Sequence, residues 1–166
     1  MKRFLLWLWR VLPLSSGLQF ALLWLINPKF LLGVVGVVVD DRGRVLLLDH
    51  SYRNESPWAL PGGWLRRGEQ PAEALVRELR EEVGLEVTDV TLLDVHLDPS
   101  VPRADISLVC RPARPDARPV PADVEVRAAG FYHLESFPHP LREDQTALIR
   151  RALRRLGRAD PADRPR

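Results

Sequence analysis

The sequence has one cysteine, little net charge and no long uninterrupted apolar run, and each shortage excludes a class of protein. Cys110 is the only cysteine in 166 residues, so an internal disulfide is excluded, and its apolar neighbours predict a small core residue. The formal net charge of +2 gives no electrostatic basis for binding nucleic acid. We therefore expect no nucleic-acid partner and a reducing, cytoplasmic location.

The apolar start of the chain is too interrupted to cross a bilayer. Its two apolar runs, residues 4–12 and 18–26, are broken by charged and polar residues, proline and glycine. A membrane-spanning helix needs about 20 predominantly apolar residues. The opening Met-Lys-Arg resembles the start of a signal peptide, but no small-x-small cleavage site follows before Asn27. Secretion is therefore not expected.

Residues 1–30 are expected to form an apolar helical extension of one or two short helices. These helices would pack on the domain or on a second subunit, which makes a homodimer one expected outcome. The alternative is peripheral membrane contact through residues 1–26, because tryptophan-rich helices with basic residues near one end lie in the bilayer interface.

The rest of the chain has the composition of a folded domain. Apolar residues make up 46% and charged residues 28%, which is typical of a globular protein. The length suits a single domain with a proper core, and we place this domain at residues 31–157. The polar, proline-containing residues 158–166 predict a disordered tail.

Strand and helix signals alternate along this domain. Valine-rich residues 31–40 and residues 44–48 predict two strands joined by a turn at residues 41–43, and therefore a hairpin. Further strands are predicted at residues 86–97, 105–111 and 124–134, and a closing helix at residues 144–156.

Residues 63–85 form the stretch around which the chain is organised. A glycine-bounded loop leads into a helix predicted to begin near residues 69–71 and to end at Val83, with Gly84 as its C-terminal cap. Glu78, Glu81 and Glu82 lie at spacings i, i+3 and i+4 and so share one face of this helix. Their repulsion costs a few tenths of a kcal/mol per pair, roughly. A hard divalent cation bound by these oxygens would reverse that cost.

The same stretch resembles the signature of the Nudix hydrolases at every specified position. The matching residues are Gly63, Glu69 and the run Arg-Glu-Leu-Arg-Glu-Glu-Val-Gly-Leu from Arg77 to Leu85. The resemblance extends over about residues 31–156 and implies an α/β fold, in which a mixed β-sheet is sandwiched between helices (α/β/α).

The resemblance also implies a reaction and a cofactor. Nudix hydrolases cleave a nucleoside diphosphate linked to another group X, using Mg²⁺ or Mn²⁺. By this resemblance Glu78, Glu81 and Glu82 are metal ligands and catalytic residues, and the carbonyl of Gly62 is a further ligand. Glu69 and Arg77 would form an ion pair, and together with Gly63 and Gly84 they would support the loop and helix structurally.

Other candidate site residues lie outside this stretch. Family members commonly supply a fourth acid after the signature, and Glu125 is the best match here, with Asp123 second; both acids also suit a solvated loop. The weaker candidates for substrate binding could instead have purely structural roles, as core aromatics or as a solvated surface arginine. These candidates are Arg53, Trp58, Tyr52 and Phe131. His50 and His96 lack partners at metal-ligand spacing, so we interpret them as structural.

The substrate preference is the least constrained part of the hypothesis. By family resemblance, ADP-ribose hydrolases carry a proline beyond the signature, and Pro99 and Pro102 flank that place. We therefore favour ADP-ribose or a similar nucleotide sugar as the small-molecule partner. The alternatives are a nucleoside triphosphate, a CDP-alcohol, or a non-catalytic nucleotide-sensing module on the same fold.

Overall fold

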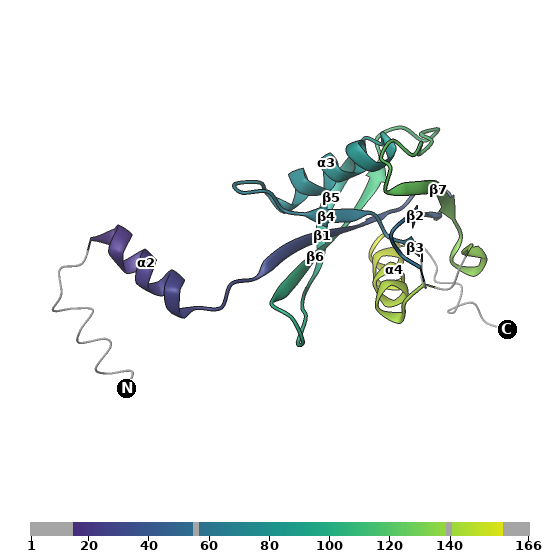
Figure 1. Ribbon diagram of the computed structural model, residues 1–166. Helices are drawn as coiled ribbons and strands as arrows, with labels where there is room; N and C mark the ends of the chain where they lie inside the picture. The colour runs from purple at the N-terminus through teal and green to yellow at the C-terminus, as the bar shows by residue number, and fades with distance from the viewer. Residues whose placement is uncertain (1–14, 55–56, 139–140, 158–166) are drawn as a thin grey trace. The chain divides into compact units, whose positions relative to one another are not determined.

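The computed structural model describes residues 15–54, 57–138 and 141–157, and Figure 1 shows its helices and strands. The chain divides into two compact units between Phe30 and Leu31. The first unit contains helix α2 (Ser16–Ile26), whose N-terminus is capped by Ser15, the side chain of which accepts the amide hydrogen of Leu18. The apolar run at residues 4–12 and the tail predicted at residues 158–166 lie outside the described residues. No helix in the described part of the chain is long and apolar enough to cross a membrane.

The second unit is built on two β-sheets. The four-stranded sheet has the order β4-β1-β6-β5 and the three-stranded sheet has the order β3-β2-β7. Strands β1 and β6 run parallel, and the other paired strands run antiparallel. The strands are β1 (Leu31–Val38), β2 (Val45–His50), β3 (Trp58–Ala59), β4 (Gly62–Trp64), β5 (Val87–Leu97), β6 (Arg103–Pro112) and β7 (Val126–Tyr132).

Helices cover the strands on two sides, as the resemblance implied. Helices α3 (Pro71–Val83) and α4 (Glu143–Arg155) lie on opposite sides of the strands in Figure 1, and a short 3₁₀ helix, η1 (Leu134–Ser136), precedes α4. Successive side chains of a strand point to opposite faces, so the strands contribute to two cores. Val34 and Val38 pack with the apolar face of α3, whereas Val37 packs with that of α4. This arrangement is the predicted α/β/α sandwich.

The hairpin predicted from residues 31–48 is wrong. Its turn exists, since the Asp40 carboxylate accepts the amide hydrogens of Arg42 and Arg44, and Val39 and Val45 form a single antiparallel bridge. Beyond that bridge, β1 pairs with β4 and β6, while β2 pairs with β3 and β7. The strands diverge because β1 pairs in parallel with the distant β6, while β2 pairs with the nearby β3 and the distant β7.

Helix α3 begins and ends where local chemistry predicts. Pro71 occupies the first turn, and the Glu73 carboxylate accepts the amide hydrogen of Gln70 at 2.9 Å. Gly84 ends the helix in the left-handed conformation, with φ of 63°, which only glycine adopts without strain. Leu75 and Leu79 are fully buried beneath the helix. This packing fixes the rotation of α3, and the acidic face is therefore held beside β4.

Candidate functional site

Glu78 lies in direct contact with the loop that precedes α3. A Cβ atom at Gly63 would collide with the carboxylate of Glu78. A side chain at position 63 would therefore displace the carboxylate of Glu78 from the backbone of β4. The contact brings the first carboxylate of the acidic face against the glycine pair that ends the preceding loop.

Arg77 ties this loop to the helix. Its guanidinium donates to both carboxylate oxygens of Glu69 at 2.8 and 3.0 Å and to the carbonyl of Trp64 at 3.1 Å. It also donates to Glu78 at 2.7 Å and to Glu81 at 3.1 Å. The hydrogen bond from Arg77 is the main reason that the pKa of Glu69 is lowered to about 2. Glu69 and Arg77 thus form the ion pair that the resemblance implied.

Glu82 is half-buried and has an unsatisfied carboxylate oxygen. Its Oε2 atom is buried and has no hydrogen-bond partner in the described part of the chain. Burial raises the pKa of Glu82 to about 8, with further contributions from the negative charges of Glu78, Asp123 and Glu125, and a hydrogen bond from the Gly62 backbone opposes the shift. The side chain therefore lies among carboxylates that favour its neutral form unless a cation is present.

The loop between β6 and β7 brings two of these acids to the end of α3. The amide of Ala122 donates to the carbonyl of Glu82 at 2.9 Å, and that of Val120 donates to the carbonyl of Val83 at 3.0 Å. Asp123 and Glu125, the two acids nominated from sequence, follow directly, and both are exposed. The loop therefore adds negative charge on the side of α3 where Glu82 is buried.

The donor set suits a hard divalent cation, although arginines hold two of the glutamates. Among the described residues, no three His, Cys, Asp or Glu side chains are grouped closely enough to hold a metal ion. Glu81 contacts Arg66 at 3.2 Å and Arg77 at 3.1 Å. The pair with Arg66 is largely exposed, and such pairs contribute about 1 kcal/mol or less. The unpartnered oxygen of Glu82 and the surrounding carboxylates fit an oxygen-bound cation such as Mg²⁺.

A cavity of about 260 Å³ adjoins this acidic face. Gly62 and Gly63 line it and also contact Glu82 and Glu78, so the glycine pair separates the cavity from the carboxylates. Tyr52 and Arg53 line the cavity as well. The remaining polar and aromatic lining residues were not nominated from sequence: His50, Trp64, Arg103, Asp105, Ser107, Arg142, Asp144 and Gln145.

The sequence contains a pattern that indicates the part of the cavity lining contributed by β6. Arg103, Asp105 and Ser107 are spaced two residues apart on β6, so their side chains share one face of the strand. Polar residues on one face of an otherwise apolar strand indicate a surface that is not packed against a core. Arg142 and Gln145 come from the start of α4, and nothing in the sequence links that segment to β6.

Two of the aromatic candidates lie elsewhere. Trp58 packs edge-on against Tyr132, with ring centroids 5.4 Å apart, beside the core beneath α4. Phe131 packs against the core beneath α3, with the guanidinium of Arg44 6.0 Å from its ring centroid. Neither residue lines the cavity, so both have the core role that was the alternative interpretation.

Known proteins resemble this chain in sequence and structure. Residues 29–154 match the family model described as the NUDIX domain. An 8-oxo-dGTP diphosphatase from Proteus vulgaris is 38% identical over 72 residues, which are 42% of this chain and 64% of that protein. The solved structure of a MutT NUDIX hydrolase from Burkholderia pseudomallei superimposes with a TM-score of 0.60 at 27% identity, covering 74% of this chain and 98% of the other.

A further solved structure is similar to this chain. An ADP-ribose pyrophosphatase from Streptococcus suis superimposes with a TM-score of 0.58 at 26% identity, covering 77% of this chain and 93% of the other. Curated relatives are matched over less of their length. The chain spans 64% of the Proteus protein and 32% of an RNA pyrophosphohydrolase from Halorhodospira halophila, which is 48% identical over 60 residues.

Proposed function

The chain belongs to the Nudix family, and we propose on this premise that it is a divalent-cation-dependent pyrophosphohydrolase of nucleoside diphosphate-linked compounds. The observation that carries the proposal is the buried, unpartnered oxygen of Glu82 among carboxylates, next to a polar cavity. A buried polar atom without a partner is costly, and a carboxylate among other carboxylates is costly to ionise. Such an arrangement is retained where binding of a cation relieves the cost.

Each residue of the signature has a role in this proposal. Glu78, Glu81, Glu82 and the carbonyl of Gly62 would hold Mg²⁺ or Mn²⁺. When bound, the cation neutralises negative charge on the diphosphate and lowers the pKa of a water molecule. Glu125 is the proposed acceptor of the proton of the attacking water. Gly63, Glu69, Arg77 and Gly84 position the acidic face without touching the reacting atoms.

We propose that residues 31–157 carry this function and that the preferred substrate is ADP-ribose or a similar nucleotide sugar. The similarity to the Streptococcus ADP-ribose pyrophosphatase supports this choice. Tyr52 and Arg53 are the proposed contacts to the substrate, since both line the cavity. A nucleoside triphosphate is the competing substrate class, because the Proteus relative is named an 8-oxo-dGTP diphosphatase.

A panel of nucleotides tests the proposal. Wild-type protein with Mg²⁺ is incubated with ADP-ribose, UDP-glucose, CDP-choline, dGTP and 8-oxo-dGTP, and the products are resolved by chromatography. We expect cleavage of the diphosphate bond, fastest with ADP-ribose, and a loss of at least about 100-fold in kcat/KM in Glu82→Gln, because a metal ligand is removed. Glu135→Gln, on η1, is the matched control and should retain wild-type activity.

The non-catalytic alternative makes the opposite prediction. A nucleotide-sensing module would bind members of the panel in calorimetry without converting any of them. Binding without turnover in the wild-type protein would therefore replace the enzyme proposal with the sensing module. Turnover of only triphosphates would keep the reaction and overturn the substrate.

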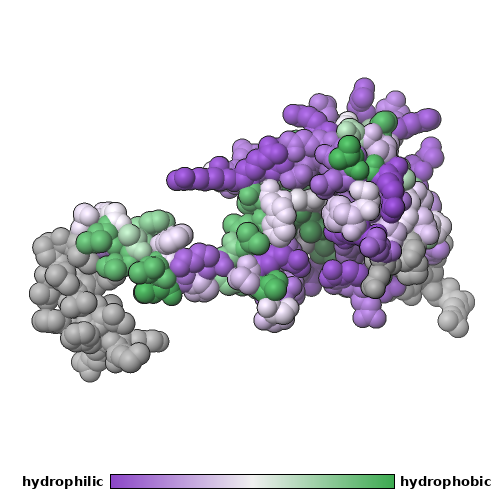
Figure 2. Space-filling view, in the orientation of Figure 1, coloured by the Kyte–Doolittle hydropathy of each residue, from purple (hydrophilic) through white to green (hydrophobic). Residues whose placement is uncertain are grey.

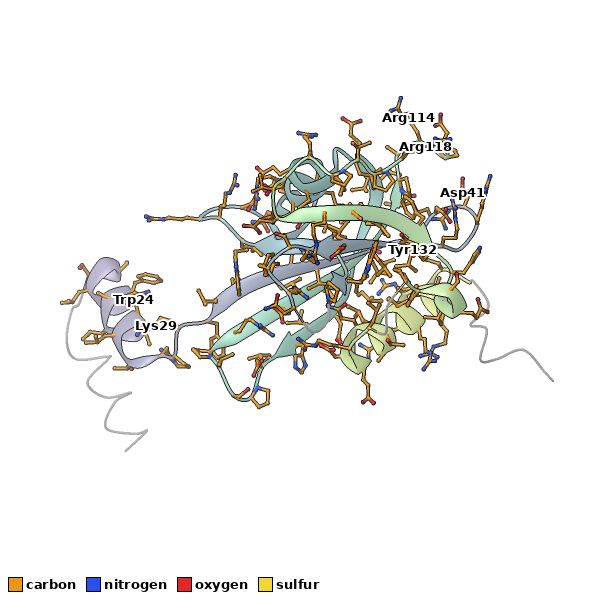
Figure 3. The ribbon with its side chains drawn as sticks, turned by 45° about the vertical axis from the view of Figure 1, so that its right-hand side comes forward. Trp24, Lys29, Asp41, Arg114, Arg118 and Tyr132 are labelled. Carbon is orange, nitrogen blue, oxygen red and sulfur yellow. The ribbon has the colours of Figure 1, made fainter. Side chains whose placement is uncertain are left out.

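Helix α2 supports a second proposal, that the protein contacts a membrane peripherally from the cytoplasmic side. The helix is apolar on all sides, with no buried residue, and Figure 2 shows hydrophobic residues on its visible surface. At its C-terminal end the Lys29 ammonium lies 4.6 Å from the Trp24 ring centroid. Figure 3 labels both residues. No acidic residue precedes Asp40. An apolar helix with tryptophan and lysine at one end suits burial in an anionic bilayer, with these two residues at the level of the headgroups.

A further inference from the structure

His50 is a buried polar residue that the proposed reaction does not use. It ends β2 and lines the cavity, and only 2% of its surface is exposed. Neither ring nitrogen has a hydrogen-bond partner among the described residues. Its ring lies against that of Tyr52, with centroids 5.3 Å apart and planes inclined at 52°. The sequence interpretation of His50 as a structural residue does not account for two unsatisfied nitrogens facing a cavity.

An unsatisfied buried imidazole costs stability unless something else binds it. Leaving a buried donor or acceptor unpaired costs about 1–3 kcal/mol, and most buried polar side-chain atoms in folded proteins do have partners. His50 borders the cavity, but its ring nitrogens are buried, so a ligand reaches them by displacing a neighbour such as the exposed ring of Tyr52. The missing hydrogen bonds are therefore available to a bound molecule.

The charge state of His50 limits what that molecule offers. Burial, assisted by the positive charge of Arg53, lowers the pKa of His50 to about 4, although Asp49 opposes this shift. The imidazole is therefore neutral near pH 7 and has one donor and one acceptor nitrogen. A neutral ring is a poor binder of phosphate compared with the guanidinium groups nearby. An uncharged group with both a donor and an acceptor matches it better.

Several charged residues of the cavity pair with each other or stack on a ring, so we assign recognition of an uncharged group to His50. Arg142 pairs with Asp144 at 2.6 Å, and Arg103 lies 3.1 Å from Asp105. Arg53 stacks over Tyr52, with its guanidinium 5.6 Å from the ring centroid. Gly62 and Gly63 border the cavity on the side of the carboxylates. A nucleotide whose diphosphate lies at the glycine pair has its uncharged part within the rest of the cavity.

We propose that His50 determines specificity by hydrogen-bonding an uncharged donor-acceptor group of the nucleotide, either the edge of the nucleobase or the ribose hydroxyls. This inference rests on the proposed function, because it takes the cavity as the substrate site. His50 touches the substrate away from the reacting phosphorus and takes no part in proton transfer. Removing its nitrogens should alter substrate choice and leave the use of Mg²⁺ unchanged.

The test compares His50→Phe with the matched control His96→Phe, in which an exposed histidine of β5 outside the cavity lining is replaced. Phenylalanine keeps a flat ring and removes both nitrogens. We expect kcat/KM for the preferred nucleotide to fall about 10- to 100-fold in His50→Phe, mainly through KM. The Mg²⁺ concentration for half-maximal rate should not change. His50→Gln, which keeps a donor and an acceptor, should recover part of the loss.

Two series of substrates identify the group that His50 binds. One series varies the base on a constant ribose, and the other compares ribose with 2′-deoxyribose on a constant base. Loss of discrimination in the first series by His50→Phe assigns the base edge, and loss in the second assigns the sugar. A parallel fall for every substrate in both His50 variants, or no change at all, overturns the proposal. If His50→Phe fails to fold, His50→Gln is measured across the same series.

Failure of the proposed function has a different signature. If the wild-type protein cleaves no diphosphate, calorimetry with ADP-ribose and with dGTP measures binding directly. A nucleotide affinity that falls at least tenfold in His50→Phe and not in His96→Phe then supports the role of His50 without catalysis. An equal affinity in both variants overturns it.

Discussion

At the residue scale, the site combines one charge that is fully paired with one that is not. Arg77 makes five hydrogen bonds to the loop and to the acidic face, whereas the Oε2 atom of Glu82 has no partner among the described residues. The first arrangement makes the loop rigid. The second is stable only with another charge nearby, which is why we assign positioning to Arg77 and cation binding to Glu82.

His50 predicts a loss of stability in mild acid. Its pKa is lowered from 6.5 to about 4 in the folded protein, so between these values the unfolded chain binds more protons than the folded chain. The contribution of His50 is therefore complete above pH 6.5 and is lost as the pH falls toward 4, by at most about 3 kcal/mol. Asp49, Arg53 and Arg127, whose guanidinium donates to the His50 carbonyl, are the charged neighbours.

Urea unfolding of the wild-type protein and of His50→Gln between pH 7 and pH 4.5 measures this effect. The wild-type protein should lose more of its free energy of unfolding over this range than the variant does. His96→Gln provides the control and should follow the wild-type curve. Parallel curves for wild type and His50→Gln would show that His50 is already protonated or solvated in the folded state.

Sequence predicted the shared helical face of the three glutamates better than the surroundings of His50. Spacing alone places Glu78, Glu81 and Glu82 on one helical face, because the helical period is fixed. Whether the nitrogens of His50 find hydrogen-bond partners depends on what surrounds the end of β2. Other residues that line the cavity with His50 come from β6 and the start of α4. No local pattern carries that information, so the sequence interpretation assigned His50 a structural role.

At the element scale, α2 predicts binding to anionic vesicles. Wild-type protein should float with vesicles of phosphatidylcholine and phosphatidylglycerol and much less with phosphatidylcholine alone, because Lys29 and the acid-free N-terminus favour negative lipid. Trp24→Glu should weaken partitioning roughly tenfold or more. Leu97→Glu replaces an exposed apolar residue of β5 and should float like wild type. Protein that stays lipid-free and dimeric by light scattering would indicate packing on a second copy instead.

The strands show which element-level predictions succeed from sequence. Composition located β1, β2, β5, β6 and β7 because valine-rich runs bounded by turns are local signals. Pairing is not local: β1 lies beside β6 in parallel register, Val34 opposite Ile106, although more than sixty residues intervene. The predicted hairpin assumed that adjacent strands pair, and the tertiary structure separated them into two sheets.

At the scale of the whole molecule, cation binding should stabilise the domain. A ligand that binds only the folded state adds about 2.7 kcal/mol at a concentration 100 times its Kd. Thermal unfolding with and without Mg²⁺ should therefore show a higher Tm with the metal in wild type and a much smaller increase in Glu82→Gln. Ca²⁺ and Na⁺ at matched ionic strength separate specific binding from screening. Equal increases in both proteins would contradict the assigned ligands.

The overall architecture was predictable because residues 63–85 resemble the Nudix signature, and that resemblance implies the α/β/α arrangement. The cavity was not predictable in the same way. It joins β1, the end of β2, β4, β6 and the start of α4, which are brought together only by the completed fold.

The attachment of the β6–β7 loop has an evolutionary consequence. Val120 and Ala122 are held to the end of α3 by main-chain amides, and these bonds form whatever side chains the loop carries. Arg114 and Arg118 project from the same loop in Figure 3 and are exposed. Apart from Ala117, which packs against the core beneath α3, residues 113–119 are therefore free to diverge, or to be exchanged by design, while the main chain keeps Asp123 and Glu125 beside the end of α3.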